Sequence, residues 1–343
     1  MKDNKKHKKA EYGILITGLI ILLAATCVIA LCAGQYRISV PEVIKILASR
    51  FVNVTKTWSN TAEGVVFTLR LPRIIGAVLV GSALSLSGAA YQGVFKNPLV
   101  APDLLGVSSG ACVGASVAIL LHLNSFGVQA MAFVAGILAV GLTLFIPRLI
   151  KNTNMTMLVL SGIIVKGIMD SVMGIIKYVA DPETELQSIT YWQLGSLTKV
   201  LPKDLFTVGP VIVAASVIIF LLRWRINILS LGDREAKTLG VSVTVVRNFI
   251  IICATLLTAS AVCISGTIGW IGLVIPHFAR MLTGPDNTKA IPASILMGAI
   301  FMVAIDTLAR ALTSVELPLS ILTGIIGAPF YIIILARQRM KLS

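Results

Sequence analysis

Long apolar runs, separated by short polar ones, follow each other along almost the whole chain. Ten apolar segments can be distinguished, at about 14–33, 74–94, 104–121, 128–147, 156–178, 205–222, 245–265, 268–282, 291–310 and 318–336. Runs of this length are typical of membrane spans, and a backbone in lipid must satisfy its own hydrogen bonds, so each run is predicted to be a helix. The pattern predicts an all-α polytopic membrane protein with about ten transmembrane helices in one domain, residues 1–343.

The first span follows a basic tail. The sequence MKDNKKHKKAEYG has the basic head of a signal peptide. The apolar stretch behind it runs from Gly13 to Gly34, which is longer than an ordinary signal peptide requires. We therefore expect an uncleaved first span behind a cytoplasmic tail, residues 1–13.

The charged residues of the chain indicate its orientation in the membrane more than they indicate a binding partner. The chain is 56% hydrophobic and 13% charged, and its formal net charge of +14 raises the question of nucleic-acid binding. The basic residues, however, lie mostly in short loops, where they orient spans in a membrane. With the N-terminus inside, 18 of them fall on the inner side and 10 on the outer side. We expect a multi-pass protein of the bacterial cytoplasmic membrane with both termini in the cytoplasm, in contact with lipid and without a nucleic-acid partner.

Three loops are long enough to carry structure. The outer loop 35–73 has helical apolar spacing after Pro41 and predicts a short surface helix. The outer loop 179–204 is acidic. The largest inner loop, 223–244, contains the charged stretch SLGDREAKTLG. That stretch is either a connection between spans or a docking surface.

Two segments of the chain align at a fixed offset of 178 residues. LSLSGAAYQGVFKNPLVAPDLLG (84–106) matches VCISGTIGWIGLVIPHFARMLTG (262–284), with Ser-Gly at 87–88 and at 265–266. Five spans separate the copies, so they are predicted to enter the membrane in opposite directions. Inverted repeats of this kind are typical of transporters, although small residues also recur by chance in membrane helices.

Catalytic motifs are absent from the sequence. There is no GxxxxGK[ST] phosphate loop, no HExxH and no GxSxG. The five cysteines lie within apolar runs without a CxxC pair, which predicts inert packing residues. We expect a transport subunit with no cofactor, no metal site and no ATPase site of its own.

Charged residues inside the spans are informative, since each costs about 2.5–3.5 kcal/mol at a helix centre. Lys166 and Asp170 are four residues apart in the fifth span, and Asp306 and Arg310 are four apart in the ninth. Each pair either lines a polar pathway or neutralises itself between helices. We predict self-neutralisation for Lys166 and Asp170, whereas Arg310 is expected at the outer boundary, where it can face an external partner.

Two further motifs stand out. RLPR, residues 70–73, places two arginines on the outer side against the usual charge bias, which suggests that they meet carboxylates of a soluble partner. GSALSLSGAAYQG and GTIGWIGLVIPH allow either close helix packing or broken helices beside a path. Our candidates for lining such a path are Gly88, Gln92, Asn97, Pro98, Gly266, Pro276 and His277.

Six motifs in order resemble one known family. They are RLPR, SGAAYQGVFKNPLVAPDLLGVSSGA, WQLGSL (192–197), LGDREAKTLGVSV, GTIGWIGLVIPHFARMLTG and ELPLSILTGIIGAPFYIIIL (316–335). Together they resemble the permease family of ABC importers for iron-siderophores, haem and cobalamin, from about residue 14 to 336. The resemblance implies the type II ABC importer permease fold, a second permease subunit, two cytoplasmic ATP-binding subunits that use the ATP, and an external substrate-binding protein.

The resemblance also implies roles for particular residues. Arginines matching Arg70, Arg73 and Arg310 are implied to receive glutamates of the binding protein. The loop matching 231–243 is implied to dock on the ATPase through short helices. The predicted coupling residues are Leu231, Gly232, Asp233, Arg234, Glu235, Ala236, Leu239 and Gly240, of which Leu231, Ala236 and Leu239 are expected to form one apolar face.

The chain departs from the family pattern at two places. Arg234 stands where relatives usually carry an acidic residue, and Pro318-Leu-Ser320 replaces the usual Pro-x-Gly. The first departure predicts that Arg234→Glu alters ATPase pairing before it alters folding. Such drift suits a heterodimer of two diverged permeases.

The leading prediction is an importer for a ferric siderophore, with cobalamin or haem as alternative cargo. An ion-coupled secondary transporter would also use an inverted repeat, but it should show unpaired acidic residues in the middle of the membrane and needs no cytoplasmic dock. An intramembrane enzyme would need a catalytic set that the sequence lacks.

Overall fold

The computed structural model describes residues 2–152, 154–313 and 315–340. All regular secondary structure in these residues is helical. The helices are α1 Lys2–Cys32, α2 Val40–Ala48, α3 Asn60–Gly64, α4 Leu71–Phe95, α5 Val107–Leu120, α6 Ser125–Leu149, α7 Met155–Val179, α8 Glu185–Leu194, α9 Pro202–Leu231, α10 Asp233–Thr238, α11 Val243–Ser265, α12 Ile271–Thr283, α13 Asn287–Ala311 and α14 Leu319–Met340. A π-helical turn, η1 Val65–Arg70, precedes α4, and a 3-10 turn, η2 Pro102–Leu105, precedes α5.

Seven of the described helices are long and apolar enough to cross a membrane, and three shorter apolar helices, α5, α12 and the greater part of α14, complete the set. These ten correspond to the ten predicted apolar segments, so the predicted fold class is confirmed. The short surface helix predicted after Pro41 is also present, as α2, with Val43 and Ile46 fully buried beneath it.

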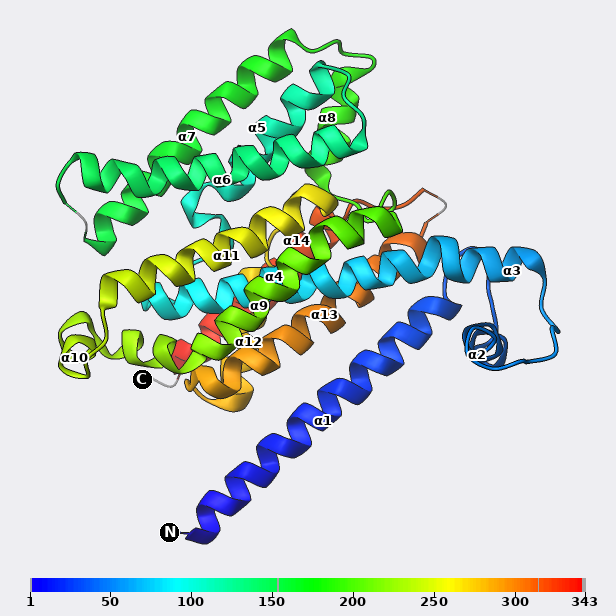
Figure 1. Ribbon diagram of the computed structural model, residues 1–343, viewed down its shortest axis with the longest axis horizontal. Helices are drawn as coiled ribbons and strands as arrows, with labels where there is room; N and C mark the ends of the chain where they lie inside the picture. The colour runs from blue at the N-terminus through cyan, green and yellow to red at the C-terminus, as the bar shows by residue number, and fades with distance from the viewer. Residues whose placement is uncertain (1, 153, 314, 341–343) are drawn as a thin grey trace.

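The bundle has two distinct ends (Figure 1). One end, called here the α10 end, carries α10 together with the start of α1 and the end of α14. The opposite end, called here the α3 end, carries α2 and α3. The helices α4 and α11 run between these ends in opposite directions, because α4 begins beside α3 and α11 begins beside α10.

Two predicted loop boundaries are wrong. Helix runs without a break from Asn60 to Phe95, so the outer loop ends at residue 59, not 73. Ser59 caps this helix by accepting a hydrogen bond from the Ala62 N–H at 3.0 Å, and the π-turn absorbs Pro72, which lacks a backbone donor. The inner loop 223–244 is also largely helical, because α9 continues to Leu231 and α11 starts at Val243.

The core forms around α4, whose small residues allow other helices to approach closely. A Cβ added at Gly88 would lie 1.8 Å from the carbonyl oxygen of Gly272 in α12, and one added at Gly81 would lie 2.2 Å from that of Gly298 in α13. Such backbone approach is the usual basis of helix packing in membranes. The Ser87 hydroxyl adds a polar contact by donating to the carbonyl oxygen of Ala254 in α11 at 2.9 Å.

The predicted residue alignment of the internal repeat has the wrong register. Both halves contain a long buried helix followed by a short one, α4 then α5 and α11 then α12, and the long helices run in opposite directions. Ser87-Gly88, however, lies in the middle of α4, whereas Gly266 ends α11 with a φ of +69°. The two Ser-Gly pairs matched because one glycine serves close packing and the other serves a left-handed turn.

Candidate functional site

The three predicted docking arginines lie together at the α3 end, but they are buried. Arg70, Arg73 and Arg310 expose 6%, 8% and 8% of their surface. Arg70 donates to the carbonyl oxygens of Leu31, at 2.6 Å, and Tyr36. The arginine thereby fixes the backbone that leaves α1, where the chain turns toward α2.

Arg73 and Arg310 share one buried carboxylate. The Arg73 Nε donates to Asp306 at 2.9 Å, and its Nη1 lies 2.8 Å from Glu316. The Arg310 Nε lies 3.8 Å from Asp306, so these two residues neutralise each other, and in this conformation Arg310 does not face outward as expected. Arg310 also donates to the carbonyl oxygens of Ala33, at 2.8 Å, and Ala30. In this conformation an incoming glutamate would have to compete with these internal acceptors.

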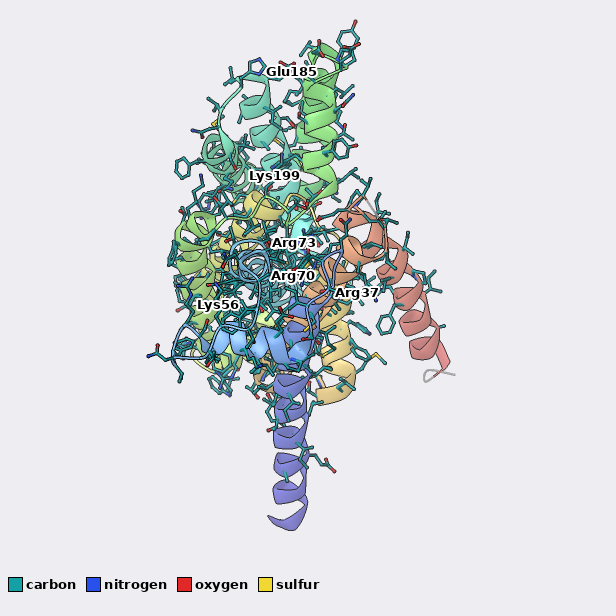
Figure 2. The ribbon with its side chains drawn as sticks, turned by 90° about the vertical axis from the view of Figure 1, so that its right-hand side faces the viewer. Arg37, Lys56, Arg70, Arg73, Glu185 and Lys199 are labelled. Atoms are coloured by element: carbon teal, nitrogen blue, oxygen red, sulfur yellow. The ribbon has the colours of Figure 1, made fainter. Side chains whose placement is uncertain are left out.

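Other basic side chains of the α3 end are open to the outside. In Figure 2, Arg37, Lys56 and Lys199 surround the central Arg70 and Arg73. The three outer side chains are exposed, and among the described residues neither Arg37 nor Lys199 forms an ion pair, whereas Lys56 pairs with Glu63 at 2.8 Å. RLPR is a recognisable motif that points to arginines that are buried, whereas no motif marks Arg37 or Lys199 in the sequence.

At the α10 end, the predicted coupling stretch contains a short helix, α10, held in place by Asp233. The Asp233 carboxylate accepts from Arg247 of α11 at 2.6 Å and from Lys96, directly after α4, at 3.5 Å. One side chain therefore joins the stretch to the ends of two core helices that belong to opposite halves of the fold. Asp233 is among the predicted coupling residues, but no sequence pattern indicates these partners.

The predicted apolar face of the coupling stretch is split. Ala236 is fully buried against the bundle, whereas Leu231 and Leu239 expose 64% and 60% of their surface. Gly232, Arg234, Glu235 and Gly240 lie at the surface or are half-buried. The three residues do not form one face, because only Ala236 belongs to the short helix, whereas Leu231 ends α9 and Leu239 follows α10. Leu231 and Leu239 are therefore available to a partner.

If the resemblance to the permeases holds, Asp233→Asn is expected to reduce uptake several-fold with only a small loss of thermal stability, because Asp233 is largely exposed and its main contacts anchor α10. Arg247→Gln should have a similar effect, and Lys96→Gln a smaller one, since the Lys96 contact is longer. The measurement is cargo transported per ATP hydrolysed in the complete transporter. Equal effects of the Lys96 and Arg247 variants would contradict this order.

The same anchor has a defined pH dependence. The hydrogen bond from Arg247 holds the pKa of Asp233 below its ordinary value of 3.8. A carboxyl with a lowered folded-state pKa stabilises the structure at neutral pH, and this contribution is lost as the pH falls through the lowered pKa. The anchor is therefore expected to be intact throughout the physiological range.

The predicted path candidates do not gather at one place. Gln92, Asn97 and Pro98 line a cavity of about 120 Å³ at the α10 end, where Arg280 donates to the Gln92 side chain. Gly88, Gly266, Pro276 and His277 are instead buried in helix contacts. The His277 ring, for example, lies edge-on to Tyr331 with 6.3 Å between ring centroids. The role of these seven residues in a path stays a prediction.

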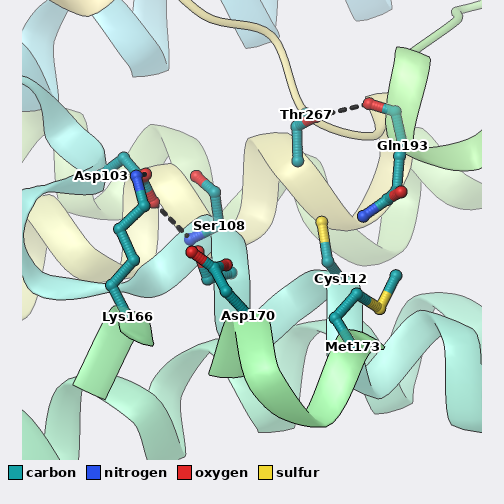
Figure 3. A pocket seen from close by; sticks show the side chains of 9 residues that line it. Asp103, Ser108, Cys112, Lys166, Asp170, Met173, Gln193 and Thr267 are labelled. Carbon is teal, nitrogen blue, oxygen red and sulfur yellow. Dashed lines mark hydrogen bonds and ion pairs between the residues drawn. The ribbon is translucent and has the colours of Figure 1, made fainter. Parts of the chain in front are cut away.

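A larger polar cavity, of about 270 Å³, lies between η2, α5, α7 and α8 and is called here the polar pocket (Figure 3). Lys166 of α7 pairs there with Asp103 at 2.9 Å, not with Asp170 as predicted. The prediction was wrong because Asp103, 63 residues away in sequence, is brought to α7 by the return of the chain after α4. Ser108 and Cys112 of α5, Asp170 of α7 and Gln193 of α8 complete much of the lining.

Comparisons with known proteins agree on one family. The profile of the FecCD transport family matches residues 21–337. The molybdate import system permease protein of Haemophilus influenzae is 38% identical over 322 residues, covering 94% of this chain and 95% of that protein. A probable iron chelatin transport system permease protein of Helicobacter pylori is 41% identical over 275 residues, covering 80% of this chain and 83% of that protein. The solved structure of a metal-chelate type ABC transporter in an inward-facing conformation matches with a TM-score of 0.85 and 35% identity, covering 95% of this chain and 99% of that chain.

Proposed function

The chain belongs to the FecCD transport family and is a multi-pass permease subunit of an ABC importer, and from this premise we propose that it carries a ferric siderophore across the bacterial cytoplasmic membrane. The cargo is supported by the similarity to an iron chelatin permease and to a metal-chelate type transporter. Haem and cobalamin are the alternatives implied by the resemblance, and molybdate is the cargo named for another close relative.

The observation that best supports ATP-driven transport is the α10 end. There Asp233 ties α10 to both halves of the core, and Leu231 and Leu239 point outward from it. An ATPase subunit that gripped these leucines would move α10, and with it the ends of α4 and α11. We therefore place the ATP-binding subunits, and both termini, on the cytoplasmic side at this end.

The α3 end is then the external side, where the substrate-binding protein arrives. Its exposed basic side chains, Arg37 and Lys199 among them, can attract the carboxylates of that protein. Arg70 and Arg73 lie in the middle of this surface (Figure 2), and Arg310 shares Asp306 with Arg73. The three arginines retain their proposed role if docking opens their internal contacts. A second permease subunit, identical or homologous, completes the pathway.

The decisive experiment measures uptake of a labelled ferric siderophore by the complete transporter with its binding protein. Replacing the catalytic glutamate of the ATPase subunit should abolish uptake. Uptake that persisted would favour an ion-coupled transporter, for which Asp170, a carboxylate in the middle of α7 without an ion-pair partner among the described residues, would be the natural coupling group. Competition by haemin, cobalamin or molybdate in the same assay separates the alternative cargoes.

Reversing two exposed charges tests the external surface. Arg37→Glu together with Lys199→Glu is expected to weaken capture of the loaded binding protein about threefold to tenfold at low salt, and less at high salt, because exposed charges are screened. Thermal stability should not change, since both side chains are exposed. Lys237→Glu, at the α10 end, is the matched control and should leave capture unaltered. An equal loss of capture in the Lys237→Glu control would contradict the assignment of the α3 end to the external side.

A further inference from the structure

The polar pocket lies at the middle depth of the protein. Lys166 is the twelfth of the 25 residues of α7, so its Cα is close to the centre of that helix. Asp103 lies on η2, which the chain forms after turning back from the end of α4. The two side chains nevertheless expose 48% and 33% of their surface. Charged groups exposed at the centre of a span face water or protein, not lipid.

The residues that line the pocket carry more negative than positive charge. Its lining contains two carboxylates, Asp103 and Asp170, and one ammonium group, Lys166, a formal net charge of −1. Asp103 is fully engaged, since one oxygen accepts from Lys166 and the other accepts from the backbone N–H of Ser108 at 3.1 Å. Asp170 interacts with Lys166 only at longer range and forms no close ion pair with any described residue, and Figure 3 shows it reaching into the pocket beside Ser108.

The neutral part of the lining suits hydrogen bonding. Gln193, at the end of α8, brings a side-chain amide, and Ser108 and Ser109 bring hydroxyl groups. Cys112 and Met173 contribute an apolar, sulfur-containing part of the same lining. A cavity of about 270 Å³ with such a lining accommodates part of an organic chelate, and it is larger than a tetrahedral oxyanion needs.

From these features we infer that the polar pocket is a cargo-contact site on the translocation path, and that it favours chelates with a positive charge or many hydrogen-bond donors over oxyanions such as molybdate. This inference rests on the proposed function and narrows its cargo. Asp170 is the free acceptor for the cargo, and the Asp103–Lys166 pair holds η2 and α7 together as the wall of the site. A dianion that enters the pocket is repelled by its net negative charge. The Ser108 and Ser109 hydroxyls offer the dianion hydrogen bonds that water offers equally well.

The charge and water access of the pocket can be measured directly. The complete transporter is reconstituted in lipid with its permease cysteines changed to alanine and with Ser109→Cys as the reporter. The thiol is labelled with a cationic and an anionic methanethiosulfonate reagent, each normalised to its rate with a free thiol. The cationic reagent should react about threefold to tenfold faster, as expected for one nearby unit charge in a wet site.

Two variants shift this ratio in opposite directions. Asp170→Asn removes the uncompensated charge and should bring the ratio close to one, whereas Lys166→Gln doubles the negative charge and should raise the ratio. Leu142→Cys on α6, which is 48% exposed on an apolar surface, is the control and should not be labelled. Ser108→Cys replaces Ser109→Cys if the first reporter does not assemble. Equal labelling rates for both reagents, or a rate ratio that Asp170→Asn leaves unchanged, would overturn the charge assignment.

Cargo contact is tested by protection in the same preparation. Ferrioxamine B, a ferric chelate with one ammonium group, should slow labelling of Ser109→Cys, and sodium molybdate at the same concentration should not. Protection by molybdate alone would overturn the cargo class, and a reporter that is unlabelled both with and without nucleotide would overturn the location. The labelling ratio does not depend on ATP-driven uptake, so failure of the proposed function and failure of this inference are separately visible.

Discussion

Gly88→Leu is expected to prevent assembly of the folded transporter. At this position of α4 a Cβ alone would lie 1.8 Å from the carbonyl oxygen of Gly272 and 2.6 Å from its carbonyl carbon. Both are backbone atoms of α12, so no side chain can move aside to make room. Overpacking in a close-packed interior costs about 1–3 kcal/mol even where some relaxation is possible, and here the two helices must separate.

Larger side chains at position 88 should cause larger losses of stability. Gly88→Ala should already lower the thermal unfolding temperature clearly, and Gly88→Leu should leave little folded protein after detergent extraction and size-exclusion chromatography. The matched control is Gly141→Ala in α6, where nothing lies within 4 Å of the added Cβ and where alanine improves helix propensity by about 1 kcal/mol. A Gly88→Ala variant as stable as the Gly141→Ala variant would mean that α4 and α12 do not meet at this point.

The second large effect is expected at Asp306. Asp306→Asn keeps the size of the side chain but removes the carboxylate that Arg73 and Arg310 share at 1% side-chain exposure. Breaking a buried ion pair by removing one partner typically costs about 3–5 kcal/mol, because the remaining charge stays buried without compensation. Here two guanidinium groups lose their common partner, and the direct contact of Glu316 is with Arg73, at 2.8 Å.

A double-mutant cycle isolates this contact from other effects of substitution. Arg73→Gln combined with Asp306→Asn should cost less than the sum of the two single changes, since Arg73 and Asp306 no longer leave each other unpaired, whereas Arg310 still loses Asp306. The control is Lys56→Gln, which breaks an exposed pair with Glu63 and should cost less than about 1 kcal/mol. Additive losses at Arg73 and Asp306 in unfolding measurements would show that the pair contributes no coupling energy.

The buried arginines change how docking at the α3 end should be understood. A surface arginine can receive a glutamate at once, whereas Arg70, Arg73 and Arg310 first have to leave the carbonyl oxygens or carboxylates that they contact. Any docking that uses them would therefore loosen the junction of α1, α4 and α13. Exposed residues such as Arg37 and Lys199 can attract the partner without this cost.

Local patterns account for what could be predicted from the sequence. Apolar runs predicted the spans, because a helix that crosses the lipid must be apolar over the thickness of the membrane, whichever helices it packs against. The helix after Pro41 was also predictable, because it depends on a spacing within one or two turns. The four-residue spacing placed Asp306 and Arg310 on one helix face, but it did not predict that Arg310 would be buried against Asp306. The ordered motifs identified the family, and with it the position of the coupling stretch.

Tertiary structure decided which distant groups meet. Nothing near Lys166 in the sequence indicates that its partner is Asp103, because that contact depends on where the chain returns after α4. The same holds for Asp233, whose partners are Lys96 and Arg247. Burial of the docking arginines and the different uses of Gly88 and Gly266 were equally invisible. A side chain's type determines what it can bind, but its partner and its exposure are set by helices that pack from elsewhere in the chain.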